Sequence, residues 1–302
     1  MPRSRAKNSL PRPDVAQTPG LTSVVIVAAD SGEDLGVCVE CLLASTVPIE
    51  VIVSDNESRD GSIEALATRW RDEPRLRILR NGSNLGFGAG CNRGAAQAHG
   101  DALLFLNPDC RIEPATIARM RALMRPDTGV VGAAIVASDG TSEPASRRRD
   151  PFLRRALMSM MGRDEINVAA DAADLQVVDI VSGAAMLLPR PAFDAVNGFD
   201  EGYFLHCEDM DLCRRVRDAG LRVACANSVR IVHAKGTSSR TRPFFVAFHK
   251  HSGMWRWFRK FDPASRNPGI RGVVWCGLWL HYAALTLRYA WQWMKARISA
   301  SG

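Results

Sequence analysis

Apolar residues in the first half of the chain form short unbroken runs that alternate with longer periodic stretches. Residues 22–28 and 49–53 are runs of strand length, rich in Val and Ile. Between them, Leu35, Cys38 and Leu42 recur at the three- and four-residue spacing of one helix face. An alternation of strand and helix patterns is typical of α/β folds built on a largely parallel sheet. We therefore predict an α/β fold.

The same alternation continues along the chain, and no internal repeat is visible. The predicted strands are residues 22–28, 49–53, 76–79, 102–106 and an apolar segment at about 130–136. The predicted helices are residues 33–44, 62–71, a small-residue helix that opens in a Gly-rich turn at 84–92 and reaches about His99, and 114–124.

Beyond these elements the pattern weakens. Residues 138–174 are polar and contain three successive arginines at 147–149, so we expect a mobile loop or an insertion on the acceptor side. Residues 177–188 return to a sheet-like apolar character. A helix is then predicted from about Glu208 to a stop at Gly220.

The length of 302 residues fits one large domain with extensions better than two equal domains. Residues 1–20 contain four basic residues, four prolines and no apolar segment of signal-peptide type, so we predict a disordered basic leader. We place the main α/β domain at residues 21–239 and a helical C-terminal extension at residues 240–302.

Charge is distributed unevenly along the chain. The net charge is +7, but the extension alone carries +10 and the leader +3, which leaves the main domain near −6. Six of the seven tryptophans also lie in the extension, from Trp255 onward. Basic and aromatic side chains gathered at one end are typical of contact with an anionic membrane or with nucleic acid. The acidic main domain carries no nucleic-acid recognition motif, so we expect no nucleic-acid partner.

Residues 273–293 within the extension form a mostly apolar helical pattern that is broken by His281 and Arg288. Arg288 makes a membrane span marginal, because a span needs about twenty nearly uninterrupted apolar residues. We favour a helix lying in the plane of an anionic membrane, with basic flanks and interfacial tryptophans. The alternatives are a helix pair packed on the main domain and a homodimer interface.

The eight cysteines show no metal or disulfide framework. Cys38 and Cys41 are spaced as C-x-x-C, but they lie on an apparent amphipathic helix, with no second pair at zinc-site spacing. We therefore expect small core residues in a reducing compartment. The predicted location is the cytoplasm, with peripheral attachment to the inner face of the plasma membrane.

Polar residues suited to ligand binding follow three of the predicted strands. They are Asp55 and Asn56 after the second strand, Asn84 and Gly86 after the third, and Asn107 and Asp109 after the fourth. Ligands of open α/β sheets bind at the carboxyl ends of strands, so these residues are expected to line one crevice. There Asp55 can accept hydrogen bonds from a nucleotide base or ribose, and the glycine turn lets the backbone approach a ligand closely.

Asp109 suits a hard divalent cation held by one or two protein oxygens together with substrate phosphates. His233, which follows an apolar run at 229–232, is the second candidate ligand. Imidazole suits Mn²⁺ at least as well as Mg²⁺. A lone histidine after a strand is equally compatible with a structural role. The predicted cofactor is Mg²⁺ or Mn²⁺, bound by Asp109 and His233.

The run from Gly198 to Arg215 carries the strongest chemical signal. A loop rich in glycine and aromatic residues leads into a helix whose first turn holds Glu208, Asp209 and Asp211. Acidic residues at a helix N-terminus can act by stabilising the helix dipole alone. A carboxylate within reach of an acceptor hydroxyl can instead take its proton as a bond forms. We assign Asp209 as the candidate general base, with Glu208 as the second catalytic carboxylate.

These motifs, taken together and in this order, resemble the family-2 glycosyltransferases with the GT-A fold, in the rhamnosyltransferase-like branch. The resemblance covers residues 22–239. It rests on Ser54-Asp55-Asn56 with Asp60-Gly61-Ser62, Asn84-x-Gly86-Phe87 with Asn92, Asn107-Pro108-Asp109, Gly198-Phe199-Asp200-Glu201, Glu208-Asp209-x-Asp211-Leu212 and His233-x-x-Gly236-x-Ser238.

The resemblance implies inverting transfer of a sugar from a nucleotide diphosphate to an acceptor hydroxyl, in cell-envelope polysaccharide synthesis. The first choice of donor is dTDP-rhamnose, ahead of UDP- or GDP-hexoses, and the acceptor would be a glycan or a lipid-linked sugar. The implied roles are donor binding by Asp55, Asn56, Asn84, Gly86, Asn92, Asn107 and Asp109, and acceptor-side or structural support by Asp200, Glu201 and Asp211.

Two departures from the family pattern bear on these roles. The first strand ends in Ala28-Ala29-Asp30, where the family usually has a Thr, Tyr or Asn combination, and Asn107 replaces the first acid of a D-x-D motif. Two other functions stay open from the residues: a catalytically silent module that binds nucleotide-sugar or glycan, and a nucleotidyltransferase on a similar sheet.

Overall fold

The protein, here a computed structural model, is described over residues 17–234 and 242–300, with side chains up to Trp291. Residues 1–16 of the predicted leader lie outside the described residues, as do Gly236 and Ser238 of the motif after His233. Strand β1 (Thr18–Ala28) begins three residues before the predicted start of the main domain at residue 21.

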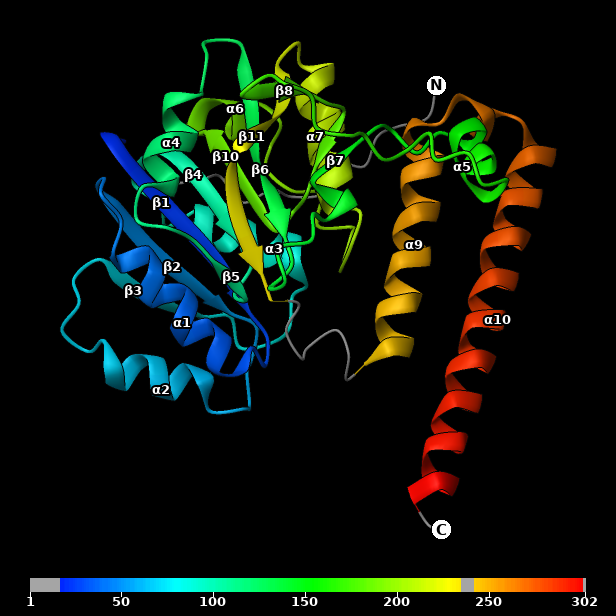
Figure 1. Cartoon of the computed structure of the whole chain (residues 1–302), viewed down its shortest axis with the longest axis horizontal. Helices are drawn as coiled ribbons and strands as arrows, with labels where there is room; N and C mark the ends of the chain where they lie inside the picture. Colours follow the sequence, from blue (N-terminus) through cyan, green and yellow to red (C-terminus); the bar gives the residue numbers. More distant parts are fainter. Residues whose placement is uncertain (1–16, 235–241, 301–302) are drawn as a thin grey trace.

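A mixed sheet forms the centre of the molecule (Figure 1). Its strand order is β3-β2-β1-β4-β10-β6-β11-β5, with β8 paired to β11. Strands β1 to β4 are parallel, β10 runs antiparallel between β4 and β6, and β11 is parallel to β6. The bounds are β2 Ile49–Asp55, β3 Leu76–Arg80, β4 Gly100–Leu106, β5 Cys110–Arg111, β6 Thr128–Val136, β8 Leu175–Val177, β10 Ala185–Pro189 and β11 Arg222–His233.

Helices cover both faces of the sheet, because successive side chains of a strand point to opposite sides. Val24 and Ile26 of β1 pack in one cluster with α1 and α2 residues such as Leu35 and Ile63. Val25 and Val27 pack in a second cluster with residues of α3, α6 and α7. The helix bounds are α1 Gly32–Leu43, α2 Ser62–Arg69, α3 Phe87–Ala95, α4 Thr116–Ala122, α6 Arg190–Ala195 and α7 Glu208–Asp218.

The expected mobile loop at 138–174 is instead partly ordered secondary structure. It contains a 3₁₀ turn η1 (Pro144–Ser146), strand β7 (Arg147–Arg148) and helix α5 (Leu153–Met160). Strand β7 pairs with β9 (Ile180–Val181), which lies more than thirty residues further along the chain. The polar sequence predicted a loop because β7 has only two residues, both arginine, and shows no alternation of apolar and polar positions that would indicate a strand.

The C-terminal extension is two long helices, α9 (Pro243–Phe261) and α10 (Pro268–Ala300), joined by a 3₁₀ turn η2 (Pro263–Arg266). They run side by side in opposite directions, with α9 toward the sheet domain and α10 outside (Figure 1). Trp257 and Phe258 of α9 are buried, and Trp257 belongs to the second core cluster. Helix α9 is therefore part of the domain core rather than an appendage to it.

Helix α10 meets the domain chiefly through α9. Phe248 lies against Trp279, with ring centroids 5.6 Å apart, and His251 Nε2 lies 2.9 Å from His281 Nδ1. Its outer side chains are open to solvent, Val273, Leu280 and Leu287 each being at least 70% exposed. By length and composition, Pro268–Trp291 is the one candidate membrane span among the described residues, with a mean hydropathy of 1.2.

Candidate active site

The carboxyl ends of β1, β2 and β4 lie side by side, and the polar residues predicted there are close together. Asp55 ends β2 with only 2% of its surface exposed, and its Oδ1 accepts a hydrogen bond of 2.9 Å from the Ser58 amide. Asn56 donates to the Gly86 carbonyl at 3.0 Å and to Asn84 Oδ1 at 3.3 Å. The ends of two neighbouring strands are thus joined through one buried amide.

Gly86 is the point where the glycine turn touches the acidic loop. It has φ +87°, and a Cβ there would overlap the Phe204 carbonyl oxygen, so only glycine fits. That same carbonyl accepts a 2.9 Å hydrogen bond from the Phe87 amide. The turn after β3 and the loop before α7 are more than a hundred residues apart in sequence, and these contacts hold them side by side.

Asn92 holds the start of the acidic loop. Its amide nitrogen donates to the Phe199 carbonyl and to Glu201 Oε1, both at 2.9 Å, and its Oδ1 accepts from the Phe199 amide at 2.9 Å. Both ends of the Asn92 amide are therefore used within the protein. The geometry gives Asn92 and Glu201 a role in fixing the loop, whereas the family pattern implied that Asn92 binds the donor.

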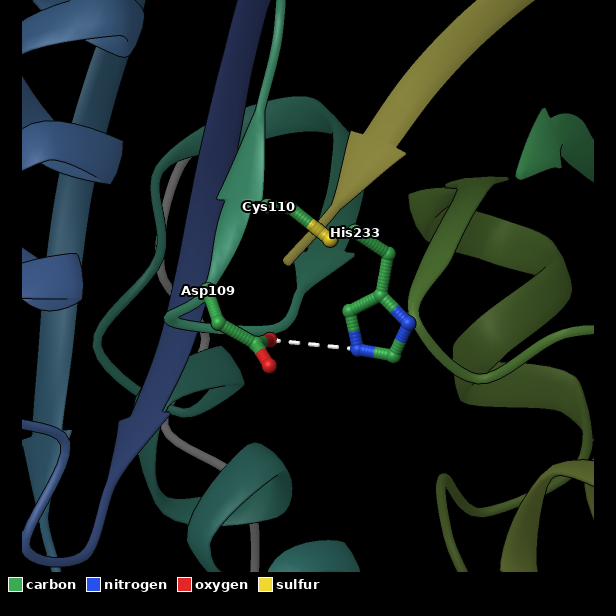
Figure 2. A group of neighbouring side chains, drawn as sticks. All are labelled: Asp109, Cys110 and His233. Atoms are coloured by element: carbon green, nitrogen blue, oxygen red, sulfur yellow. Dashed lines mark ion pairs between the residues drawn. The ribbon is translucent and has the colours of Figure 1, made fainter. Parts of the chain in front are cut away.

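Asp109 lies in the loop that follows β4, and His233 is the last residue of β11; their side chains face each other (Figure 2). Asp109 Oδ1 lies 3.2 Å from His233 Nε2, and Asn107 Nδ2 lies 3.3 Å from the same nitrogen. On the other side of the ring, His233 Nδ1 lies 3.3 Å from Glu143 Oε1. Burial lowers the pKa of His233, but the hydrogen bond to Asp109 and the charges of Asp109 and Glu143 outweigh it, so that the pKa is raised.

This pair fits a divalent cation. Asp109 Oδ1 and His233 Nε2 lie close enough together to be ligands of one ion, and a carboxylate oxygen is a preferred ligand of hard divalent cations. Glu143, on the far nitrogen, would fix the ring orientation and tautomer, as carboxylates do for metal-bound histidines. Cys110 is near, but burial raises the pKa of its thiol well above the usual range. An oxygen and an imidazole nitrogen suit Mn²⁺ or Mg²⁺ better than that thiol does.

The two adjacent carboxylates of α7 have different surroundings. Asp209 Oδ2 accepts from the Arg148 guanidinium at 2.7 Å and from the Gly183 amide at 3.1 Å. Glu208 is buried on the side of α3, where its Cβ lies 3.8 Å from the position that a Cβ on Gly88 would take. Its Oε2 has no hydrogen-bond partner among the described residues. Burial, followed by the charge of Asp209, raises the pKa of Glu208 to about 8.

One short turn connects the Asp209 site to the Asp109 site. Gly183 donates its amide to Asp209, and the next residue, Ala184, accepts the Asn107 amide at 2.9 Å through its carbonyl. Asp209 and the loop that carries Asn107 and Asp109 therefore contact neighbouring residues of this turn. A single centre that contains Asp109 and Asp209 stays a prediction, which these contacts support.

Asp200 and Asp211 are bound by cations of α9. Lys260 Nζ contacts Asp200 Oδ2 at 2.8 Å and Asp211 Oδ2 at 2.5 Å, and Arg256 donates to both oxygens of Asp200 at 2.8 and 2.9 Å. Asp211 is fully buried and also accepts from Arg215 at 2.5 Å. Burial raises the pKa of Asp200, but bonds to Lys260 and Arg256 outweigh it and hold the pKa well below its usual range. Cations of α9 therefore neutralise both of these carboxylates.

Four residues at or near the site were not predicted: Glu143, Arg148, Arg256 and Lys260. The three successive arginines at 147–149 were a visible signal within a polar stretch. The bases of residues 240–302 were noticed only as a charged tail. Each of the four acts on a partner at least 49 residues away in sequence, so local spacing carried no sign of the contact.

The chain has relatives among known proteins. The profile of the Glycosyl transferase family 2 matches residues 23–195. The N-acetylglucosaminyl-diphospho-decaprenol L-rhamnosyltransferase of Mycobacterium tuberculosis is 33% identical, with 71% of this chain and 79% of that protein aligned.

Two solved structures share the fold. The mannosyltransferase PcManGT of Pyrobaculum calidifontis, in complex with GDP-Man and Mn²⁺, aligns with a TM-score of 0.58 at 17% identity, over 89% of this chain and 74% of that chain. GalNAc-T7 with UDP, GalNAc and Mn²⁺ aligns with a TM-score of 0.56 at 15% identity, over 71% of this chain and 43% of that chain. The mixed sheet, its flanking helices and the predicted GT-A architecture agree with these structures. With its motifs at the strand ends and this profile match, the chain belongs to the Glycosyl transferase family 2, and it is a glycosyltransferase.

Proposed function

We propose that the protein transfers L-rhamnose, with inversion, from dTDP-rhamnose to a hydroxyl of a glycan or lipid-linked acceptor, in cell-envelope polysaccharide synthesis. The observation that carries the proposal is that Asp209 and Asn107, which belongs to the same loop as Asp109, contact the neighbouring residues Gly183 and Ala184. Support for the sugar and for a lipid-linked acceptor comes from the Mycobacterium tuberculosis relative, whose name specifies both.

The donor would lie across the carboxyl ends of β1, β2 and β4. Asp55, Asn56, Asn84 and Gly86 would form the nucleotide wall, and Asn107 and Asp109 would face the diphosphate. Asp109 and His233 would hold Mg²⁺ or Mn²⁺, and a bound ion there supplies charge neutralisation for the diphosphate leaving group. Solved structures of the same fold carry Mn²⁺ with a nucleotide or nucleotide sugar, which supports this role.

Asp209 would act as the general base. The acceptor oxygen attacks the anomeric carbon of the donor, its proton passes to the Asp209 carboxylate, and the bond from that carbon to the diphosphate oxygen breaks. Attack from the face opposite the leaving group gives inversion. Arg148 and the Gly183 amide hold one oxygen of Asp209 in place. Glu208 is less suited to the same step, because burial favours its protonated form.

The acceptor would be presented at a membrane. Helix α10 exposes Val273, Leu280 and Leu287, and the extension carries a net charge of +10. Each basic residue near an anionic surface contributes about 1 kcal/mol, so several, together with apolar burial, suffice for reversible attachment. We therefore propose peripheral binding to the cytoplasmic face of the plasma membrane. The exposed face of α10 is equally available for a homodimer, which is the alternative.

A panel of nucleotide sugars tests this function against its rivals. The protein is incubated with dTDP-rhamnose and with UDP- and GDP-hexoses, in the presence of lipid-linked N-acetylglucosamine acceptors, and the products are measured. Transfer from dTDP-rhamnose with release of dTDP supports the proposal. Tight nucleotide binding without turnover on any donor would favour a silent binding module, and release of pyrophosphate from a nucleoside triphosphate would favour a nucleotidyltransferase.

A further inference from the structure

Helix α9 makes direct contact with the loop and helix start that carry Glu208 and Asp209. We propose that α9 is a positioning element for the catalytic carboxylates, with Lys260 as its main positioning residue and Gly253 as its point of backbone contact. The inference deepens the proposed function, since it takes Asp209 as the base on which the positioning acts.

The first set of contacts is ionic. Lys260 Nζ bridges Asp200, at the start of the acidic loop, and Asp211, in the first turn of α7. Glu208 and Asp209 lie between these two anchors along the chain. Although one-third of the Lys260 side chain is exposed, its partner Asp211 is fully buried. A buried carboxylate that lost its cation would have to move or take up a proton. The Lys260 bridge therefore ties both ends of the catalytic segment to α9.

Arg256, one turn earlier on α9, adds to the same anchor. Its Nη2 donates to both oxygens of Asp200, and its guanidinium lies 5.2 Å from the centre of the Tyr203 ring. The Tyr203 side chain is itself buried in the second core cluster. The acidic loop is thus held from α9 by both charge and packing.

The second contact is between backbones. His206 and Cys207 both have left-handed conformations, with φ +68° and φ +71°, directly before Glu208. Such conformations cost free energy for residues with side chains and persist where the surroundings impose them. Gly253 of α9 lies against this turn: a Cβ there would be 2.9 Å from the His206 carbonyl oxygen and 3.1 Å from Cys207 Sγ. The left-handed turn at 206–207 sets the direction in which α7 begins, and α9 packs against this turn at Gly253.

The charge contact is tested by Lys260→Met in the full-length protein, with Arg259→Met as the matched control. Arg259 is the neighbouring residue of the same helix and lies over the Trp255 ring, and among the described residues it has no carboxylate partner. Both variants lose one positive charge, so attraction to an anionic membrane falls equally. We expect Lys260→Met to lower kcat by on the order of 10- to 100-fold with donor Kd within about threefold, because misplacement of the base acts on the chemical step. Lys260→Arg should restore most of the rate.

The backbone contact is tested without any change of charge. Gly253→Ala should push α9 away from the 206–207 turn, whereas Gly272→Ala, on α10, adds a methyl group where nothing lies within 4 Å. We expect Gly253→Ala to reduce kcat and to speed hydrogen exchange of the amides at 203–209, with Gly272→Ala unchanged in both. This variant keeps the proposal testable if Lys260→Met fails to fold.

The outcomes separate this inference from the proposed function. Equal kcat and equal hydrogen exchange at 203–209 in Gly253→Ala and in its control would overturn the positioning role. The same would follow if Lys260→Met matched Arg259→Met. If the wild-type protein transferred sugar from none of the donors, the proposed function would fail, but the exchange comparison would still decide whether α9 positions the segment.

Discussion

At the scale of single residues, two neighbouring carboxylates have different surroundings, which agrees with the different roles that we propose for them. Asp209 is anchored by Arg148 and by the Gly183 amide, whereas Glu208 is buried toward α3. From the sequence we predicted Asp209 as the general base and Glu208 as the second catalytic carboxylate, but the sequence does not show what surrounds each side chain, because adjacent positions at a helix start differ in the direction of the side chain. That direction is fixed by partners elsewhere in the chain.

The separation of roles predicts unequal effects of isosteric substitutions. Asp209→Asn should reduce kcat by on the order of 10²–10⁴, because a side-chain amide cannot take up the proton of the attacking hydroxyl group. The affinity for the donor should stay near that of the wild type. Glu208→Gln should cost much less, since Glu208 is largely protonated near neutral pH. Steady-state kinetics and donor-binding calorimetry on both variants measure this. A near-normal rate in Asp209→Asn with a large loss in Glu208→Gln would reverse the assignment.

The raised pKa of Glu208 also predicts a pH-dependent stability. Below its ordinary pKa of 4.5, Glu208 is protonated in the folded and unfolded states and has no effect. Between that value and about 8 only the unfolded chain releases the proton, so the folded state loses about 1.4 kcal/mol per pH unit. Above about 8 the penalty is complete. Glu208→Gln should remove it, so the variant gains stability relative to the wild type as pH rises across this window.

Urea unfolding of the two proteins at several pH values measures the effect. The control is Glu64→Gln, an exposed position on α2. Curves of wild type and Glu208→Gln that stay parallel from pH 5 to 8.5 would show that Glu208 ionises normally.

At the scale of elements, the sequence predicted those whose signal is local. Strands β1, β2 and β4 are continuous apolar runs, so they and the residues at their ends, Asp55 and Asp109, could be identified. Strand β7 could not, because it exists only by pairing with β9. Helix α9 was predicted as part of a basic tail, yet its Trp257 is in the core and its Lys260 reaches Asp200, sixty residues away in sequence. The sequence therefore identified residues with suitable chemistry, but it did not predict contacts between residues far apart in the chain.

The contacts of α9 also change where the chain can be shortened. A protein ending near residue 239 would lose Trp257, Arg256 and Lys260 from the domain. If such a protein failed to bind a membrane, the cause could be misfolding of the domain rather than loss of a membrane-binding helix. A protein ending at Asn267 keeps α9 and η2 and removes α10 alone. We therefore propose that the functional domain extends through η2, beyond the boundary expected from the sequence.

The element-scale prediction follows from the exposed face of α10. The protein ending at Asn267 should fold, should transfer sugar to a short soluble acceptor at a rate close to that of the full chain, and should fail to co-sediment with anionic vesicles. Full-length protein should pellet with those vesicles and be partly released by high salt. Equal pelleting of the two proteins, or none for either, would exclude the membrane role. If the full-length protein were also a dimer that dissociates without α10, the dimer alternative would hold.

At the scale of the whole molecule, the distribution of charge matches the arrangement of the parts. The positive extension consists of α9, which packs on the sheet domain, and of α10, which lies outside α9, whereas the acidic main domain carries the strand-end site (Figure 1). An acidic domain that binds a diphosphate must offset the repulsion between like charges. In the proposed function, a divalent cation held by Asp109 and His233 would offset this repulsion.

The central claim is that Asp109 and His233 on one side, and Asp209 on the other, form one metal-dependent centre for sugar transfer. The most direct test is the initial rate of transfer from dTDP-rhamnose after EDTA treatment and again after addition of Mn²⁺ or Mg²⁺, for the wild type and for Asp109→Ala. We predict that EDTA abolishes transfer by the wild type, that added metal restores it, and that Asp109→Ala recovers only at much higher metal concentration. Transfer that continues at the full rate in EDTA, or equal metal dependence in the two proteins, would contradict the account.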